Sequence, residues 1–285
     1  MERQQVALRW HWVYRDFLAA QAQCPSDERW LDTYARAYLR PHVRLLTAVH
    51  FSPKGFSTEE QVLARINQLG RRHFSPLVQA IQQPGAYEAA LKNIARQLLT
   101  TLRHQPHPRD IYVIVGLDCT NIYSLVDHGR DVTVLCLESV QGQLEDVRLL
   151  LAHEVHHWAR QVSFANLFAS TLGERMVTEG LAAVFSEEAC PGRAIWDYCF
   201  VPPATVEWVQ HHWHDLEALL AWDQVRKNDL LDALFARQPA NSFSPGMPPR
   251  VGYVYGYLKV KAYLHTVNRL AGAAVDLPWT QIWMA

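Results

Sequence analysis

The chain contains one short stretch in which residues able to bind a metal ion are crowded together. His153, Glu154, His156 and His157 fall within five consecutive positions of the segment LLLAHEVHHWARQ. In one register, His153, Glu154 and His157 form the pattern H-E-x-x-H. On a helix, positions i and i+4 lie on one face, about 6 Å apart at their Cβ atoms, so the two imidazoles can converge on one zinc ion. His156 points away from that face, and we expect it to hydrogen-bond to a neighbouring group.

The glutamate of this pattern, Glu154, projects beside the face that carries the two histidines. From there its carboxylate can take a proton from a water on the ion instead of binding the ion itself. The segment is apolar from Leu149 to Ala152 and again at Val155 and Trp158, which predicts a helix in the core. Ionisable side chains that face a core need a partner, and a metal ion is one of the few good ones.

A catalytic zinc ion needs a third protein ligand. The longer pattern H-E-x-x-H-x-x-G-x-x-H is absent, because WARQVSF follows His157. The candidates are the carboxylates of the next predicted helix: Glu174, Glu179, Glu187 and Glu188. We favour Glu179, because Gly180 and the alanines of TEGLAAVF suit close packing against another helix. We expect Glu174 at the solvated surface and the last two glutamates at the exposed end of the helix.

Two tyrosines near the C-terminus could assist catalysis at such a zinc site. Tyr253 and Tyr257 lie in GYVYGYL and would share one face of a helix. A phenol at this point could donate a hydrogen bond to a developing oxyanion. Gly252 and Gly256 would let the same face approach another backbone closely. The alternative interpretation is a packing seam of small residues with the tyrosines at the surface.

The periodicity of the chain predicts helices, with two strands between them. IYVIVGL (111–117) and DVTVLCLE (131–138) predict strands separated by a turn around Asp127-His128-Gly129. The strand 131–138 directly precedes the H-E-x-x-H helix and is our candidate for an edge strand that pairs with an extended peptide. Helices are predicted over residues 6–22, 28–39, 58–70, 87–104, 144–162, 174–188 and 252–270. The helix 58–70 is expected to start with a capping box of Ser57 and Glu60 and to end at Gly70.

The predicted fold is therefore α+β: mostly helical, with a small β-sheet next to the H-E-x-x-H helix. The proline-containing segment HQPHPRD, residues 104–110, is a plausible linker. It divides the chain into an N-terminal helical region of unknown role, residues 1–106, and a metallopeptidase domain, residues 107–285.

Composition limits the class of protein and its partners. Hydrophobic residues make up 49% of the chain and charged residues 19%, as in ordinary soluble globular proteins. The 27 basic and 28 acidic residues nearly cancel, which argues against a nucleic-acid partner. No apolar run is long enough for a membrane span or a signal peptide. Five cysteines without CxxC spacing are typical of reduced thiols in a cytoplasmic protein: Cys24, Cys119, Cys136, Cys190 and Cys199.

A second group of histidines lies further along the chain, at His211, His212 and His214. Trp213 and Asp215 interleave with them, and no cysteine or carboxylate stands at a metal-ligand spacing. We therefore expect a solvated helix face there.

Three segments together resemble a known family: HEVHH, then TEGLAAVFSE, then GYVYGYLKVKAYL. They are similar to the predicted zinc-dependent proteases of the YjaZ-like family, which belongs with the gluzincins, and the resemblance covers roughly residues 111–270. It implies a gluzincin fold and one catalytic Zn²⁺ held by His153, His157 and Glu179, with Glu154 as general base. It also implies a peptide or protein substrate. One departure is Ala183, since many gluzincins have an aspartate four residues after the ligand glutamate, where it orients a zinc histidine.

The function predicted from these observations is that of a cytoplasmic zinc metallopeptidase, which hydrolyses peptide bonds through a zinc-activated water. Two alternatives remain open. One is a zinc-binding regulatory protein on a peptidase fold with little or no activity, which the missing aspartate supports. The other is a hydrolase of amides that are not peptides.

Overall fold

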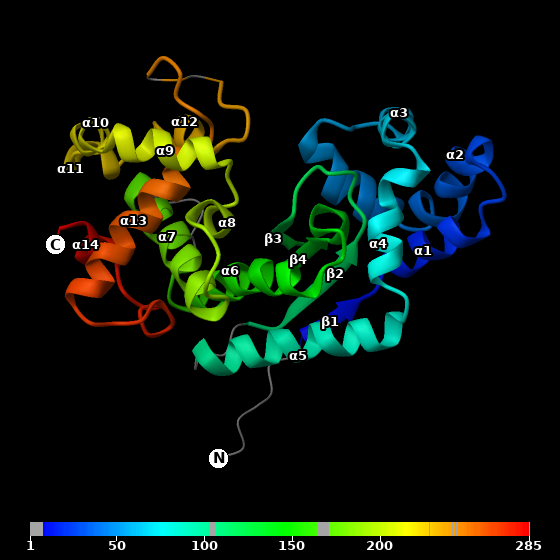
Figure 1. The fold of residues 1–285 in the computed structure, drawn as a ribbon, viewed down its shortest axis with the longest axis horizontal. Coiled ribbons are helices and arrows are strands. Elements are labelled where there is room, and N and C mark those ends of the chain that lie inside the picture. Colours follow the sequence, from blue (N-terminus) through cyan, green and yellow to red (C-terminus); the bar gives the residue numbers. More distant parts are fainter. Residues whose placement is uncertain are drawn as a thin grey trace. The chain divides into compact units, whose positions relative to one another are not determined.

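The computed structural model describes residues 8–102, 107–164, 171–227, 229–240, 242 and 244–284 (Figure 1). Contacts divide the chain into two compact units. The first comprises Met1–Ile94 with His107–Leu150, and the second Ala95–Pro106 with Leu151–Ala285. Compactness by contacts does not test independent folding, so the expected domain boundary at His107 stays a prediction.

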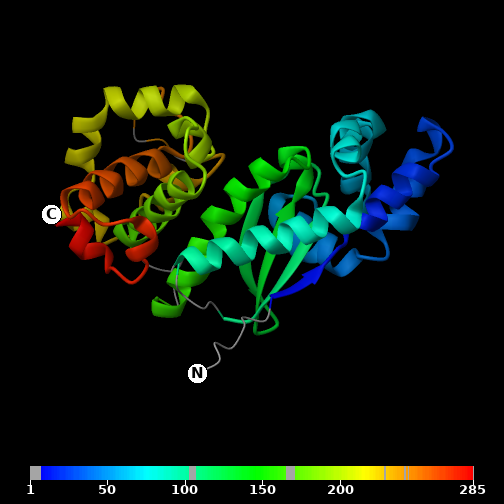
Figure 2. The same ribbon diagram turned by 60° about the horizontal axis from the view of Figure 1, so that its bottom comes forward.

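The first unit is built around a four-stranded sheet, whose strands lie side by side in Figure 2. The order is β1 (Leu8–His11), β2 (Arg109–Ile114), β4 (Arg130–Cys136) and β3 (Ile122–Asp127). β1, β2 and β4 are parallel, and β3 is antiparallel to β4. The predicted strands thus exist as β2 and β4, although each ends earlier than expected.

Two strands that the sequence did not predict complete the sheet. β1 lies inside the segment 6–22, where a single helix was expected; pairing with β2 overrides local helical preference, and Arg9 binds Asp110 at 2.9 Å across that pair. β3 joins β4 through His128 and Gly129, which both have positive φ, as a two-residue hairpin turn of type I′ requires. The expectation that 131–138 is an edge strand is wrong, because β4 pairs on one side with β2 and on the other with β3.

The helices of the first unit surround an aromatic core. Phe17 makes edge contacts with the rings of Trp30, Tyr34, Tyr38 and Phe74. The α-helices are α1 (Tyr14–Gln23), α2 (Trp30–Tyr34), α3 (Glu59–Leu69), α4 (Ser75–Ala80) and α5 (Pro84–Leu102), with π-helical turns at Ala35–Leu39 and Arg44–Phe51.

The start of α3 corrects one local prediction. The capping box is formed by Thr58 and Gln61, one residue later than expected, with the Gln61 amide donating to Thr58 Oγ1 at 3.2 Å. The helix ends at Gly70 as predicted, with φ of 72°.

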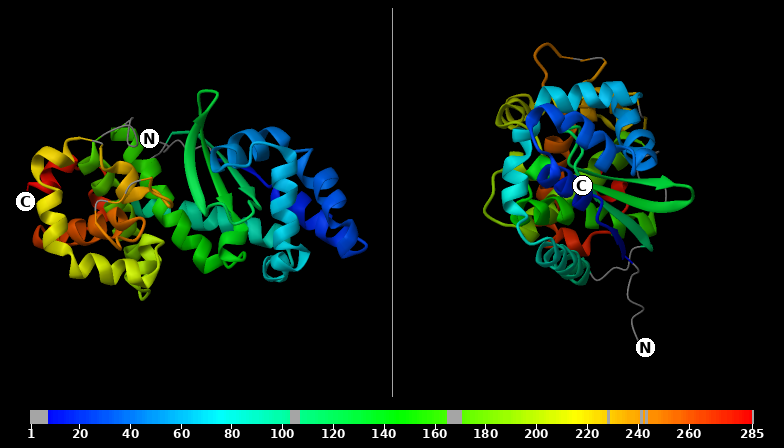
Figure 3. Two further views of the ribbon diagram at one scale, coloured as in Figure 1. Left: turned by 90° about the horizontal axis from the view of Figure 1, so that it is seen from above. Right: turned by 90° about the vertical axis from the view of Figure 1, so that its right-hand side faces the viewer.

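The second unit is helical in every described element, as the views of Figure 3 show. It contains the C-terminal part of α6 (Leu144–Ser163), then α7 (Leu172–Ala189), α8 (Ile195–Cys199), α9 (Pro203–His211), α10 (Trp213–Leu219), α11 (Trp222–Val225), α12 (Leu231–Phe235), α13 (Val251–Thr266) and α14 (Trp279–Trp283). The prediction of a mostly helical α+β fold with a small sheet is confirmed. Among the residues that the structure describes, no helix is long and apolar enough to cross a membrane.

The closest helix contact in the second unit depends on two glycines. A Cβ atom at Gly180 of α7 would overlap the carbonyl oxygen of Gly256 on α13. A Cβ at Gly256 would in turn lie 2.5 Å from the carbonyl oxygen of Met176. The two backbones therefore touch, as the small residues of TEGLAAVF and GYVYGYL predicted, and this contact fixes the position of α7.

Candidate metal centre

The histidines of the H-E-x-x-H pattern lie on α6, whose core-facing side is apolar as predicted. His153, Glu154 and His157 are each about 5% exposed or less. One helical turn separates the two histidines, and their rings meet edge to face with centroids 4.7 Å apart. The ring of Phe200, a residue with a positive φ of 52°, packs edge-on against His153.

The carboxylate that faces these histidines is that of Glu179 on α7. The helix starts with Thr171, whose hydroxyl accepts the amide hydrogen of Glu174 at 3.3 Å. Two turns later Glu179 is 2% exposed, and it directly precedes Gly180 at the contact with α13. Close packing of α7 against α13 thus positions the buried carboxylate of Glu179 beside the imidazoles of α6.

The three side chains form a compact ligand set. Glu179 Oε2 lies 3.0 Å from His153 Nε2 and 3.3 Å from His157 Nε2, and the two Nε2 atoms are 3.1 Å apart. Tetrahedral zinc bonds of about 2.0–2.1 Å place neighbouring ligand atoms about 3.3 Å from each other. The residues present therefore fit a zinc ion. Among the described residues, His153, His157 and Glu179 are the group of side chains close enough together to hold a metal ion.

Electrostatics keep these groups in the states that bind metal. Burial lowers the pKa of His153, which favours the neutral imidazole. For Glu179, burial alone would raise the pKa, but the charge of Arg175 and the contacts with His157 and His153 outweigh it. The pKa of Glu179 is held well below its usual range, so the carboxylate stays ionised. The charge of Glu154 also acts on His153, raising the pKa of that imidazole, which places Glu154 beside the ligand set.

Sequence reasoning missed Arg175, which lies one turn before Glu179 on α7. Its Nη2 forms an ion pair with Glu179 Oε1 at 2.8 Å, and the side chain of Tyr253 lies beside its guanidinium. The spacing i, i+4 between an arginine and a glutamate was a usable signal. It was not informative alone, because such pairs are common on exposed helix faces.

The two predicted tyrosines have different surroundings. Tyr253 lies beside Arg175, with its ring against Phe235 at a centroid distance of 5.2 Å. Tyr257 is buried, and its hydroxyl donates to Glu187 Oε2 at 2.8 Å. Glu187 is two turns beyond Glu179 on α7, or about 12 Å along the helix axis. Of the two tyrosines, Tyr253 is thus the one that lies beside Arg175, the ion-pair partner of Glu179.

The other glutamates of α7 hold the unit together. The expectation that Glu174 is solvated is wrong: it is buried and accepts a hydrogen bond from Arg160 Nη2 at 2.7 Å. Arg160 lies on α6 and also donates to the carbonyl oxygens of Val275 and Leu277, so it ties α6 to α7 and to the C-terminal segment. Glu188 lies at the exposed end of α7 as expected, and there it accepts the amide hydrogens that begin the short helix Ala271–Ala273.

The remaining histidines take no part in the ligand set. His156 Nε2 lies 3.4 Å from the carbonyl oxygen of Ala271, on the opposite side of α6, as its position in the pattern indicated. His211 and His214 are exposed, in agreement with a solvated helix face. His212 stacks on Trp208, with ring centroids 4.1 Å apart.

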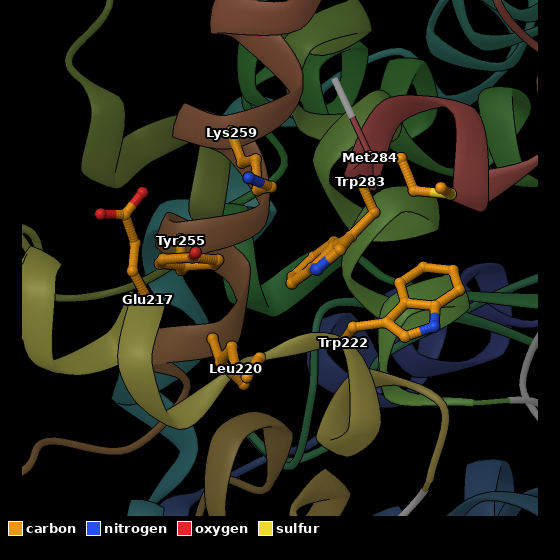
Figure 4. A pocket seen from close by; sticks show the side chains of 8 residues that line it. Glu217, Leu220, Trp222, Tyr255, Lys259, Trp283 and Met284 are labelled. Carbon is orange, nitrogen blue, oxygen red and sulfur yellow. The ribbon is translucent and has the colours of Figure 1, made fainter.

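A hollow of about 420 Å³ elsewhere in the second unit is lined mainly by aromatic rings (Figure 4). Tyr255, Trp283 and Trp222 form its walls, and Glu217 and Lys259 stand at it as charged groups. None of the three metal-ligand candidates lines it. We therefore place the candidate chemistry at α6 and α7 and not in this hollow.

Two imidazoles one helical turn apart, a carboxylate from the next helix and a further buried glutamate define a candidate zinc site of the metalloprotease type. The chain belongs to a family described as predicted Zn-dependent proteases (DUF2268), which matches residues 94–283, about two thirds of its length. This agrees with the resemblance seen in HEVHH, TEGLAAVFSE and GYVYGYLKVKAYL, and all three segments lie within the match. No curated protein and no solved structure shows a significant match.

Proposed function

We propose that the protein is a zinc metallopeptidase of gluzincin type that hydrolyses peptide bonds in a peptide or protein substrate. The observation that carries this proposal is the ligand set, in which His153 Nε2, His157 Nε2 and Glu179 Oε2 lie 3.0–3.3 Å from one another in a buried position. A bound zinc ion in such a set supplies a Lewis acid that acidifies water and polarises a carbonyl group. Membership of the family of predicted Zn-dependent proteases supports the same activity.

Glu154 is the residue to which we assign proton transfer. Its carboxylate takes a proton from the attacking water and then passes it to the amide nitrogen that leaves. The role requires a carboxylate that is beside the ligands without being one of them. The position of Glu154, next to His153 on α6 and outside the three-residue ligand set, meets this requirement.

Tyr253 is the residue to which we assign stabilisation of the oxyanion. A phenol can donate a hydrogen bond to the oxygen on which negative charge develops. In support of this role, Tyr253 lies beside Arg175, which forms an ion pair with the proposed ligand Glu179, whereas the hydroxyl of Tyr257 donates to Glu187. We further propose that the enzyme acts in the cytoplasm, since an odd number of cysteines without CxxC spacing is typical of a protein in a reducing compartment.

The test is a comparison of the purified wild-type chain with Glu154→Gln. Both are analysed for zinc and then incubated with an unfolded protein substrate. We expect zinc near one equivalent in both, and a loss of about 10²- to 10⁴-fold in cleavage by the variant, the usual contribution of general acid–base catalysis.

Three outcomes would contradict the proposal. Failure of the wild type to bind zinc after reconstitution would remove the site itself. Zinc binding by a wild type that cleaves no peptide library would favour the regulatory alternative, and cleavage of small amides alone would favour the non-peptide hydrolase. A His157→Ala control should lose zinc and activity together.

A further inference from the structure

Metal-binding side chains are usually held by partners outside the ligand set, and among the described residues His153 lacks such a hydrogen-bond partner. Ala183, at the position of the aspartate seen in many gluzincins, is buried and offers only a methyl group. His153 Nδ1 is also buried and has no hydrogen-bond partner among the described residues. Packing against Phe200 is the contact that orients this ring. The ligand set therefore requires a fixed point other than the second nitrogen of His153.

The carboxylate of Glu179 has that fixed point. Its two oxygens have separate partners: Oε1 forms an ion pair with Arg175 Nη2 at 2.8 Å, while Oε2 faces both histidines. Arg175 is one turn earlier on the same helix, so it can reach the oxygen that does not face the imidazoles. Only one oxygen of Glu179 is left for a metal ion.

Arg175 is itself held in place by two further helices. Tyr253 of α13 lies beside it, and the ring of Phe235 of α12 lies 5.5 Å from the guanidinium carbon. The Arg175 side chain is 23% exposed, so most of it is enclosed by these contacts. An arginine held on three sides behaves as part of the scaffold and not as a mobile surface charge.

We propose that Arg175 is a positioning residue that restricts Glu179 to monodentate binding of the metal ion. By occupying Oε1 it keeps the carboxylate from taking a second coordination position, and that position stays open for water and substrate. The inference rests on the proposed zinc site. In many gluzincins an aspartate orients one of the zinc histidines. In this protein, the inference gives an orienting task to Arg175, which acts on the ligand glutamate Glu179.

Metal affinity alone is a poor test of this role, because Arg175 acts on it in opposite directions. Its positive charge repels a metal cation, whereas its ion pair with Oε1 holds the carboxylate of Glu179 in place. The coordination number is the direct readout. Cobalt(II) reports it, since four-coordinate cobalt absorbs visible light much more strongly than five-coordinate cobalt.

The experiment compares the full chain, freed of metal by chelation and loaded with cobalt(II), in wild-type and Arg175→Met form. We expect an intense, four-coordinate spectrum for the wild type and a weaker, five-coordinate spectrum for the variant, in which Glu179 binds through both oxygens. Arg175→Lys, which keeps one donor, should restore much of the wild-type spectrum. With zinc, kcat/KM of Arg175→Met should fall about 10- to 100-fold, mainly through kcat.

Arg226→Met is the matched control, because Arg226 is an exposed arginine of the same unit that lies over the ring of Trp222. It should leave spectrum and activity unchanged. If Arg175→Met does not fold, zinc-edge X-ray absorption of the wild type serves instead, and it should count four ligand atoms. Identical spectra for wild type and Arg175→Met, or a five-coordinate wild type, would overturn the inference, whereas failure of the wild type to bind metal would overturn the proposed function.

Discussion

At the residue scale, the centre combines groups that the sequence identifies with groups that only the fold brings together. His153, Glu154 and His157 are recognisable because one short motif contains them, and Glu179 because small residues flank it. No local motif identifies Arg175 or Glu174. Their roles depend on partners distant in the chain or on how deeply one face of a helix is buried. A charged stretch such as GER predicts a surface, and only the buried guanidinium of Arg160 explains why Glu174 lies inside.

The two tyrosines of α13 give a matched prediction at this scale. Tyr253→Phe should lower kcat/KM about 10²-fold with little change in stability, since it removes a hydrogen-bond donor from the oxyanion. Tyr257→Phe should leave kcat/KM near the wild-type value and destabilise the fold by about 1 kcal/mol, because it removes the buried end of the bond to Glu187. Steady-state kinetics and urea unfolding of both variants measure these effects. The reverse pattern of activities would assign the donor role to Tyr257.

At the element scale, the position of Glu179 depends on the contact between α7 and α13. Gly180→Ala places a methyl group against the carbonyl oxygen of Gly256, and neither backbone can yield easily. We expect a loss of about 1–3 kcal/mol in the free energy of unfolding, as for other overpacked cores, together with a lower zinc content because the ligand is displaced. Urea unfolding and metal analysis test this.

The control for that substitution is Gly85→Ala at the start of α5. Nothing lies within 4 Å of a Cβ added at Gly85, and its φ is not positive. Alanine there should be neutral or slightly stabilising, since it restricts the unfolded chain. Equal effects of the two substitutions would show that the glycine contact does not position α7.

Element prediction succeeded where the pattern was local and failed where pairing was distant. The hydrophobic periodicity of α5, α6 and α7 sufficed to place these helices within a few residues. β1 formed instead of the first turns of a helix because β2, about a hundred residues later, offers a partner. The error about β4 is an exception, because its status as an inner strand follows from a local hairpin to β3. His128 and Gly129 were recognised as a turn, but the strand before it was not predicted.

At the scale of the whole molecule, all three ligand candidates and Arg175 belong to the second unit. A metal ion that binds only the folded chain stabilises it by about 4 kcal/mol when its free concentration is a thousand times the Kd. Chelation should therefore reduce the hydrogen-exchange protection of α7 and of the α6 residues from Leu151 onward, with β2 and β4 retaining theirs. Hydrogen exchange read by mass spectrometry, before and after removal of zinc, measures the change. Loss of protection spread evenly over both units would show that they unfold as one.

The family match begins at residue 94, and the sheet of the first unit contains strands from before and after that residue. β2, β3 and β4 lie inside the matched range of 94–283, but β1 and the aromatic core around Phe17 precede it. A shortened chain beginning at residue 94 would contain every proposed catalytic residue and yet lack β1, one of the two neighbours of β2. The buried strand β2, with Ile111 and Val113, would then become an open edge able to pair with a second chain. The extent of sequence similarity thus marks the part of the chain that holds the proposed catalytic residues, whereas safe shortening of the protein must follow strand pairing.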